Sequence, residues 1–128
     1  MTAPAEEHGR YQVASEPFAR LWEGLSRLLE AREQADQAAA DPWQFAVPAQ
    51  GLRDEGLGNS ELRILILTAI VSHRIETTGP RDDRRFFRYA AELEVVDRSC
   101  FVLTVEGLTL ARHHLVAVRH ATGPDVTL

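Results

Sequence analysis

Histidine and cysteine are the side chains in this sequence most able to bind a metal or act as nucleophiles. The chain has five histidines and one cysteine, and the densest group is His113-His114 with His120. Adjacent side chains on a helix point about 100° apart, so one helix face does not present both members of the pair. The sequence also lacks CxxC, HExxH and any other recognised ligand spacing. It therefore predicts no metal site and no cofactor.

Cys100 lies in the strand-like run Ser-Cys-Phe-Val-Leu-Thr, which favours burial as a small hydrophobic residue. A catalytic thiolate needs a helix N-terminus or a neighbouring cation. Arg98 is close in sequence, but no histidine and acid can be assigned to the thiol. His73 falls on the apolar side of a predicted strand, which is typical of a core histidine.

The acidic pairs Asp54-Glu55 and Asp82-Asp83 occupy predicted turns and read as solvated carboxylates. The glycine-containing run GLRDEGLGNS has no GK[ST] ending, so it is not a phosphate-binding loop of that type. These features favour a non-enzymatic protein. A small enzyme using Cys100 or a histidine is a weaker alternative.

An N-terminal amphipathic helix is predicted over residues 16–40, after a flexible arm at 1–15. Ser15-Glu16-Pro17 is a helix-start signal, and an apolar stripe with 3.6-residue spacing follows. The helix should stop near Ala39, before Asp41-Pro42, because a residue preceding proline avoids the helical region. Trp22 is a candidate anchor for the core or an interface, and residues 17–40 offer a surface for a homodimer.

The next segment predicts a short helix, a turn and a second helix. The short helix falls in AQGLRDEGLG and the turn at Gly58-Asn59, and Ser60-Glu61 begins the second helix. Leu62 and Leu65 are expected to face inward. The run ILILTAIV also suits a buried strand, so segment 60–71 stays open as helix, strand or both.

From residue 71 the hydrophobic period becomes two, which predicts a strand over 71–77. A turn cluster at 78–83 precedes a returning strand over 84–89, and the alternation of apolar and acidic residues continues through Leu93 and Val95. Cys100–Thr104 predicts a further strand. Thr104 then caps a short helix over 105–113, followed by one possible strand at 115–118 and a flexible tail at 120–128.

Three stretches carry a resemblance to winged helix-turn-helix proteins: GLRDEGLGNSELRILIL, AIVSHRIETTGPRDDRRFFR and CFVLTVEGLTLAR. The third is similar to the strand, Leu-Thr, x-x-Gly and helix ending of MarR-like and PadR-like regulators. The chain also resembles small uncharacterised bacterial proteins with a Trp-x-Phe-Ala-Val start and a Cys-Phe-Val-Leu-Thr strand. The expected fold class is α+β and winged helix-like over residues 43–119. It has three to four helices, a small antiparallel β-sheet and the N-terminal amphipathic helix.

This resemblance implies a recognition helix over 59–68 and a wing over 81–88, and hence a DNA-binding, transcription-regulating module. The side chains expected to contact double-stranded DNA are Ser60, Arg63, Arg81, Arg84, Arg85 and Arg88. Glu61 repels phosphate on that helix, and Ile64 and Leu67 are unsuited to reading base edges.

The alternative keeps the fold and discards the nucleic acid: an adaptor that binds a protein through Trp22, Ile64 and Leu67. A net charge of −5, with the excess acid in the first half of the chain, is unfavourable for nucleic acid and anionic membranes. The longest apolar stretch, Ile64–Val71, is eight residues against roughly 20 for a membrane span. A single cysteine and the absence of a secretory signal predict a cytoplasmic protein without a membrane partner, and the resemblance implies that it is bacterial.

Overall fold

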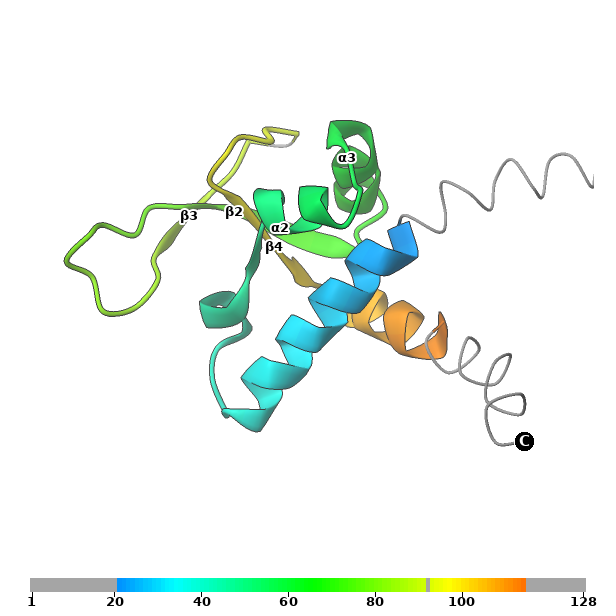
Figure 1. The fold of residues 1–128 in the computed structure, drawn as a ribbon, viewed down its shortest axis with the longest axis horizontal. Helices are drawn as coiled ribbons and strands as arrows, with labels where there is room; N and C mark the ends of the chain where they lie inside the picture. Colours follow the sequence, from blue (N-terminus) through cyan, green and yellow to red (C-terminus); the bar gives the residue numbers. More distant parts are fainter. Residues whose placement is uncertain (1–20, 92, 115–128) are drawn as a thin grey trace, which may run out of the picture.

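The structure is a computed structural model that describes residues 21–91 and 93–114 (Figure 1). These residues form an α+β fold with four α-helices and a four-stranded antiparallel sheet, which confirms the predicted class. The predictions for residues 1–20 and 115–128 lie outside the described residues. Among the described helices, none has both the length and the hydrophobicity that crossing a bilayer requires.

The first helix covers residues 21–37, and its inward stripe buries Leu25, Leu28, Leu29 and Ala35. It ends two residues earlier than predicted, because Ala39 adopts a left-handed conformation (φ 53°) and the backbone N–H of Ala40 donates to the Ala35 carbonyl. Asp41 then caps the 3-10 helix η1 (Pro42–Phe45), accepting a 3.0 Å hydrogen bond from the Trp43 N–H.

Two short helices follow β1 (Val47–Pro48): α2 (Ala49–Asp54) and α3 (Asn59–Leu67). The turn between them uses Gly56 at φ 97°, where glycine avoids the steric cost that other residues meet. Segment 60–71 is thus a helix that passes through a turn into a strand beginning at Val71. The helix ends where the Thr68 hydroxyl donates to the Ile64 carbonyl at 2.7 Å. The next residue, Ala69, adopts a left-handed conformation at φ 59°.

The sheet has the strand order β1-β4-β2-β3, with β2 at Val71–Glu76, β3 at Phe87–Tyr89 and β4 at Ser99–Leu103. Val71 faces Leu103 and His73 faces Phe101, which is fully buried at the centre of the core. Helices cover this side of the sheet (Figure 1). The strand predicted over 84–89 begins only at residue 87, and the alternation at 93–96 forms no strand.

The last described helix covers residues 105–114 and begins as predicted after Thr104. The Thr104 hydroxyl oxygen accepts from the Gly107 N–H at 2.9 Å, and the hydroxyl donates to the Ala69 carbonyl at 2.7 Å. One side chain therefore caps this helix and joins it to the end of α3.

Candidate functional site

The outward face of α3 is the first candidate surface. Leu62 and Leu65 are buried in the core, so helical geometry leaves Ser60, Arg63, Ile64 and Leu67 outside. Ile64 is 45% exposed and Leu67 is 64% exposed. The predicted positions on this helix are therefore brought together on one accessible face, but two of its side chains are aliphatic.

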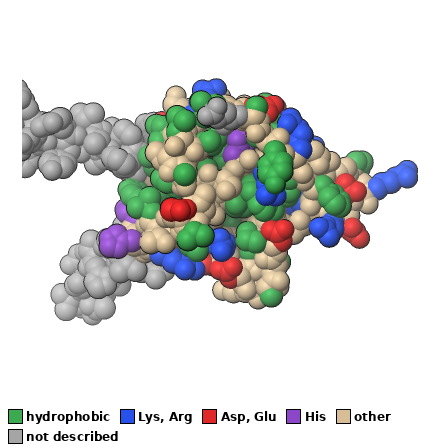
Figure 2. Space-filling view, turned by 180° about the vertical axis from the view of Figure 1, so that it is seen from behind, with side chains coloured by type: hydrophobic (Ala, Val, Ile, Leu, Met, Phe, Trp, Pro, Cys, Tyr) green, Lys and Arg blue, Asp and Glu red, His purple; other side chains and the backbone are tan. Residues whose placement is uncertain are grey.

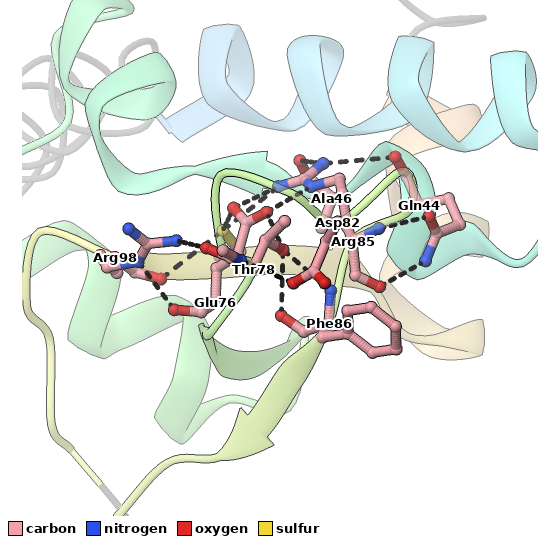
Figure 3. Close-up of polar contacts among 10 residues, drawn as sticks. Gln44, Ala46, Glu76, Thr78, Asp82, Arg85, Phe86 and Arg98 are labelled. Atoms are coloured by element: carbon pink, nitrogen blue, oxygen red, sulfur yellow. Dashed lines mark hydrogen bonds and ion pairs between the residues drawn. The ribbon is translucent and has the colours of Figure 1, made fainter.

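The β2–β3 hairpin is the second candidate surface, and Arg85 is held at its base (Figure 3). The Arg85 Nε and Nη2 atoms donate to the two carboxylate oxygens of Glu76, each at 3.0 Å. Both side chains are at most a quarter exposed. A two-point pair of this kind is among the stronger charge-assisted contacts, and it fixes the guanidinium plane.

Arg85 also links the hairpin to η1 and β1. Its Nη1 atom donates to the Ala46 carbonyl at 2.9 Å and to the Gln44 carbonyl at 3.3 Å. The Gln44 amide group donates to the Arg85 carbonyl and accepts from the Arg85 N–H, both at 2.9 Å. Because the backbone N–H of Arg85 is used in this way, β3 starts later than the sequence pattern predicts. The prediction that the Arg85 guanidinium faces a nucleic acid is corrected, since this group is turned inward and paired.

The pKa of the Glu76 carboxyl is lowered to about 2, first through the hydrogen bonds from Arg85 and secondarily through that from Thr78. In the unfolded chain this group titrates near its ordinary value of 4.5. A depressed folded-state pKa stabilises the fold above the unfolded value, and this stabilisation is lost as the pH falls from about 4.5 towards about 2.

We expect Glu76→Gln to flatten this acid dependence. Urea unfolding of the wild-type protein should show that the Glu76 carboxyl accounts for a fall of about 2 kcal/mol in the free energy of unfolding between pH 6 and 2.5. The variant should start less stable and lose less on acidification. Glu106→Gln, on an exposed helix turn, is the matched control, and equal slopes in wild type and Glu76→Gln would contradict the assignment.

The other wing arginines are differently placed. Arg88 donates to Glu94 at 3.4 Å and to the Tyr89 carbonyl at 3.1 Å, whereas the Arg84 guanidinium lies 5.3 Å from the centre of the Phe86 ring. Among the described residues, neither Arg81 nor Arg84 has an acidic partner within 4.0 Å. Figure 2 shows cationic and acidic side chains next to each other at this end of the molecule.

The predicted DNA contacts do not form one surface. The β2–β3 loop extends away from α3 (Figure 1). The loop that approaches α2 is instead the one before β4, where Asp97 lies 3.8 Å from Arg53. Arg63 on α3 is therefore separated from the arginines of the β2–β3 loop. The side chain near α2 is the acidic Asp97.

The sequence did not identify a stack of three side chains on the other side of the sheet. The Arg74 guanidinium lies 4.2 Å from the Trp43 ring centre and 5.1 Å from that of Tyr89. Arg74 and Tyr89 are cross-strand partners in β2 and β3. Their position on the same side of the alternating hairpin was the available signal, but the approach of Trp43 from η1 is a long-range contact.

The remaining candidates have internal partners. Burial raises the pKa of the Cys100 thiol to about 11, so it is protonated at neutral pH. The Trp22 ring stacks on His114 with centres 3.6 Å apart, and His73 stacks on Phe101 and hydrogen-bonds to Ser99. Within the described ranges, no three histidine, cysteine or acidic side chains are grouped to hold a metal ion. His120 lies outside those ranges.

Comparisons of this sequence and structure with protein-family models, curated proteins and solved structures found no match. The site must therefore be interpreted from its own geometry.

Proposed function

We propose that the chain is a winged-helix domain acting as a non-enzymatic protein-binding module. The support for the fold is the order helix, β1, α2, α3, β2, β4, with β4 paired between β1 and β2. In that reading α2 and α3 are the helix-turn-helix pair, and β3 is an added strand within the connection from β2 to β4.

The observation that carries the protein-binding function is the exposure of Ile64 and Leu67, three residues apart on one face of α3. Val105, also exposed, begins the helix that Thr104 joins to the end of α3. Aliphatic side chains on a helix face match the apolar side of an amphipathic helix in a partner protein. Such a partner would bury this apolar surface at the second helix of the pair.

Double-stranded DNA is the second candidate ligand. It is favoured by the position of Arg63 on α3 and by the absence of acidic partners within 4.0 Å of Arg63, Arg81 and Arg84 among the described residues. The separation of α3 from the arginine-containing loop argues for the protein partner, because groove reading requires neighbouring phosphate contacts.

The test introduces a photo-crosslinking amino acid at position 67 of the protein expressed in cells. The same amino acid at position 109 is the control. A partner crosslinked only from position 67 should bind the purified wild-type chain. Ile64→Asp with Leu67→Asp should weaken that affinity at least about tenfold, because such anchors dominate protein interfaces. Ile64 is only 45% exposed and Leu67 lies at the negative end of the α3 dipole, so each aspartate should cost about 1 kcal/mol of unfolding free energy, and circular dichroism melting checks that the variant remains folded.

DNA binding is measured in parallel at about 50 mM salt with a mixed-sequence duplex. Loss of duplex affinity in Arg63→Ala, whose side chain lies on α3, with no change in the aspartate variant, would reject the protein-binding proposal in favour of DNA. A partner that binds the aspartate variant as tightly as wild type would also reject it.

A further inference from the structure

The outer side of the β2–β3 hairpin presents an aromatic ring on a rigid support. Tyr89 is 81% exposed, although one side of its ring faces the Arg74 guanidinium. Arg74 lies in turn on Trp43, whose ring is 5.3 Å from that of Phe87. The side chain of Tyr89 is therefore held in place while most of its surface remains available.

The elements that carry this stack are fixed by independent contacts. Arg74 and Tyr89 are paired in the β2–β3 ladder. Asp41 caps η1 at the Trp43 N–H, and the contacts of Arg85 with Gln44 and Ala46 hold η1 against the hairpin (Figure 3). A preformed platform of this kind loses little conformational freedom when a ligand binds.

A second aromatic side chain, Phe86, directly precedes β3, where the alternation of the strand turns it away from the side that carries Phe87 and Tyr89. Phe86 is 43% exposed, and the Arg84 guanidinium lies over its ring. Arg84 and Arg81 have no acidic partner within 4.0 Å among the described residues, whereas Asp82 and Asp83 between them oppose anion binding. The guanidinium beside the Tyr89 ring is therefore that of Arg74, which has no acidic partner within 4.0 Å among the described residues.

We infer that this hairpin surface, centred on Tyr89, binds a single-stranded nucleic acid by stacking an unpaired base on the Tyr89 ring. An exposed ring on a strand recognises the flat face of a base, and the adjacent Arg74 guanidinium is the cation available to a backbone phosphate. The bases of a duplex expose only their edges in the grooves, so an isolated tyrosine platform suits single strands better. This binding is separate from the proposed partner site on α3.

The experiment measures fluorescence anisotropy of labelled oligothymidine and oligouridine of about 12 nucleotides at about 50 mM salt, with a duplex of equal length alongside. We expect the wild-type chain to bind a single strand more tightly than the duplex. Tyr89→Ala should weaken single-strand affinity about tenfold. Tyr89→Phe should retain it, because the ring is kept.

Leu67→Asp is the matched control, since it alters an exposed side chain on α3 and should leave oligonucleotide affinity unchanged. Circular dichroism melting checks that Tyr89→Ala remains folded, and Tyr89→Phe tests the ring if it does not. Failure of the wild type to bind either strand would overturn the inference, as would equal affinities of wild type and folded Tyr89→Ala. A Tyr89-dependent preference for a peptide or duplex would also overturn it. None of these results decides the α3 proposal, whose variants are scored on a protein partner.

Discussion

Gly107→Ala should lower the free energy of unfolding by about 3 kcal/mol, because the added methyl group meets backbone that cannot move aside. A Cβ atom at this position would overlap the Ile70 carbonyl oxygen and lie 2.9 Å from the carbonyl carbon. The helix over 105–114 would have to shift, which would also strain the Thr104 bonds to Ala69 and Gly107. The measurement is urea unfolding monitored by circular dichroism.

The sign of this effect makes the test decisive. In an unconstrained helix, replacing glycine by alanine stabilises by about 1 kcal/mol. Thr109→Ala, on an exposed position of the same helix, is the control and should change stability by less than about 0.5 kcal/mol. An alanine variant at 107 as stable as wild type would contradict the close packing of this helix against residue 70.

The close approach of Gly107 to Ile70 explains the Leu-Thr-x-x-Gly spacing, which the sequence alone shows only as a similarity to winged-helix proteins. In Leu-Thr-x-x-Gly, the threonine oxygen accepts from the glycine N–H three residues later, and the hydroxyl bonds back to residue 69. The glycine then lets the helix approach the chain between α3 and β2. Threonine and glycine at this spacing are therefore both required by one junction.

Local periodicity predicted the elements whose burial is set by neighbours in sequence. The apolar stripe of the first helix and the alternation in β2 correspond to buried positions. The sequence leaves segment 60–71 open because the run ILILTAIV is rich in β-forming residues and periodicity does not separate a buried strand from a buried helix. Helical spacing resolves it in the structure: Leu62 and Leu65 enter the core, and Ile64 and Leu67 remain outside.

The surface of the hairpin was harder to predict, because its side chains are sorted by contacts distant in sequence. Arg84 and Arg85 look equivalent as neighbouring cations in a predicted loop. Gln44, 41 residues before Arg85, draws the backbone and guanidinium of that residue inward, whereas Arg84 remains exposed. Trp43 similarly reaches Arg74 only because η1 is held against the β2–β3 hairpin by the contacts of Gln44 with Arg85. Charge counting in the loop therefore overestimated the cations available to a ligand.

Arg85→Met should cost about 2–3 kcal/mol of unfolding free energy, somewhat less than the about 3–5 kcal/mol typical of breaking a fully buried ion pair. The substitution leaves the Glu76 carboxylate without its two-point donor and removes the donor to the Ala46 carbonyl. Both charged side chains retain some solvent exposure, which limits the penalty. Chemical unfolding at pH 7 gives the change directly.

Arg84→Met is the matched control, because it removes the same charge from the adjacent exposed position and should change stability by less than about 0.5 kcal/mol. Combining Arg85→Met with Glu76→Gln should destabilise by less than the sum of the single changes, with a coupling of about 1–3 kcal/mol. Arg85→Met should also reduce the acid dependence between pH 4.5 and 2, since Glu76 then lacks the hydrogen bonds that lower its pKa. If Arg84→Met and Arg85→Met lowered the free energy of unfolding equally, the charge of the loop would determine stability. The contacts of Arg85 with Glu76, Gln44 and Ala46 would then not be responsible. In the structure Arg85 is part of the fold, whereas the neighbouring Arg84 remains exposed.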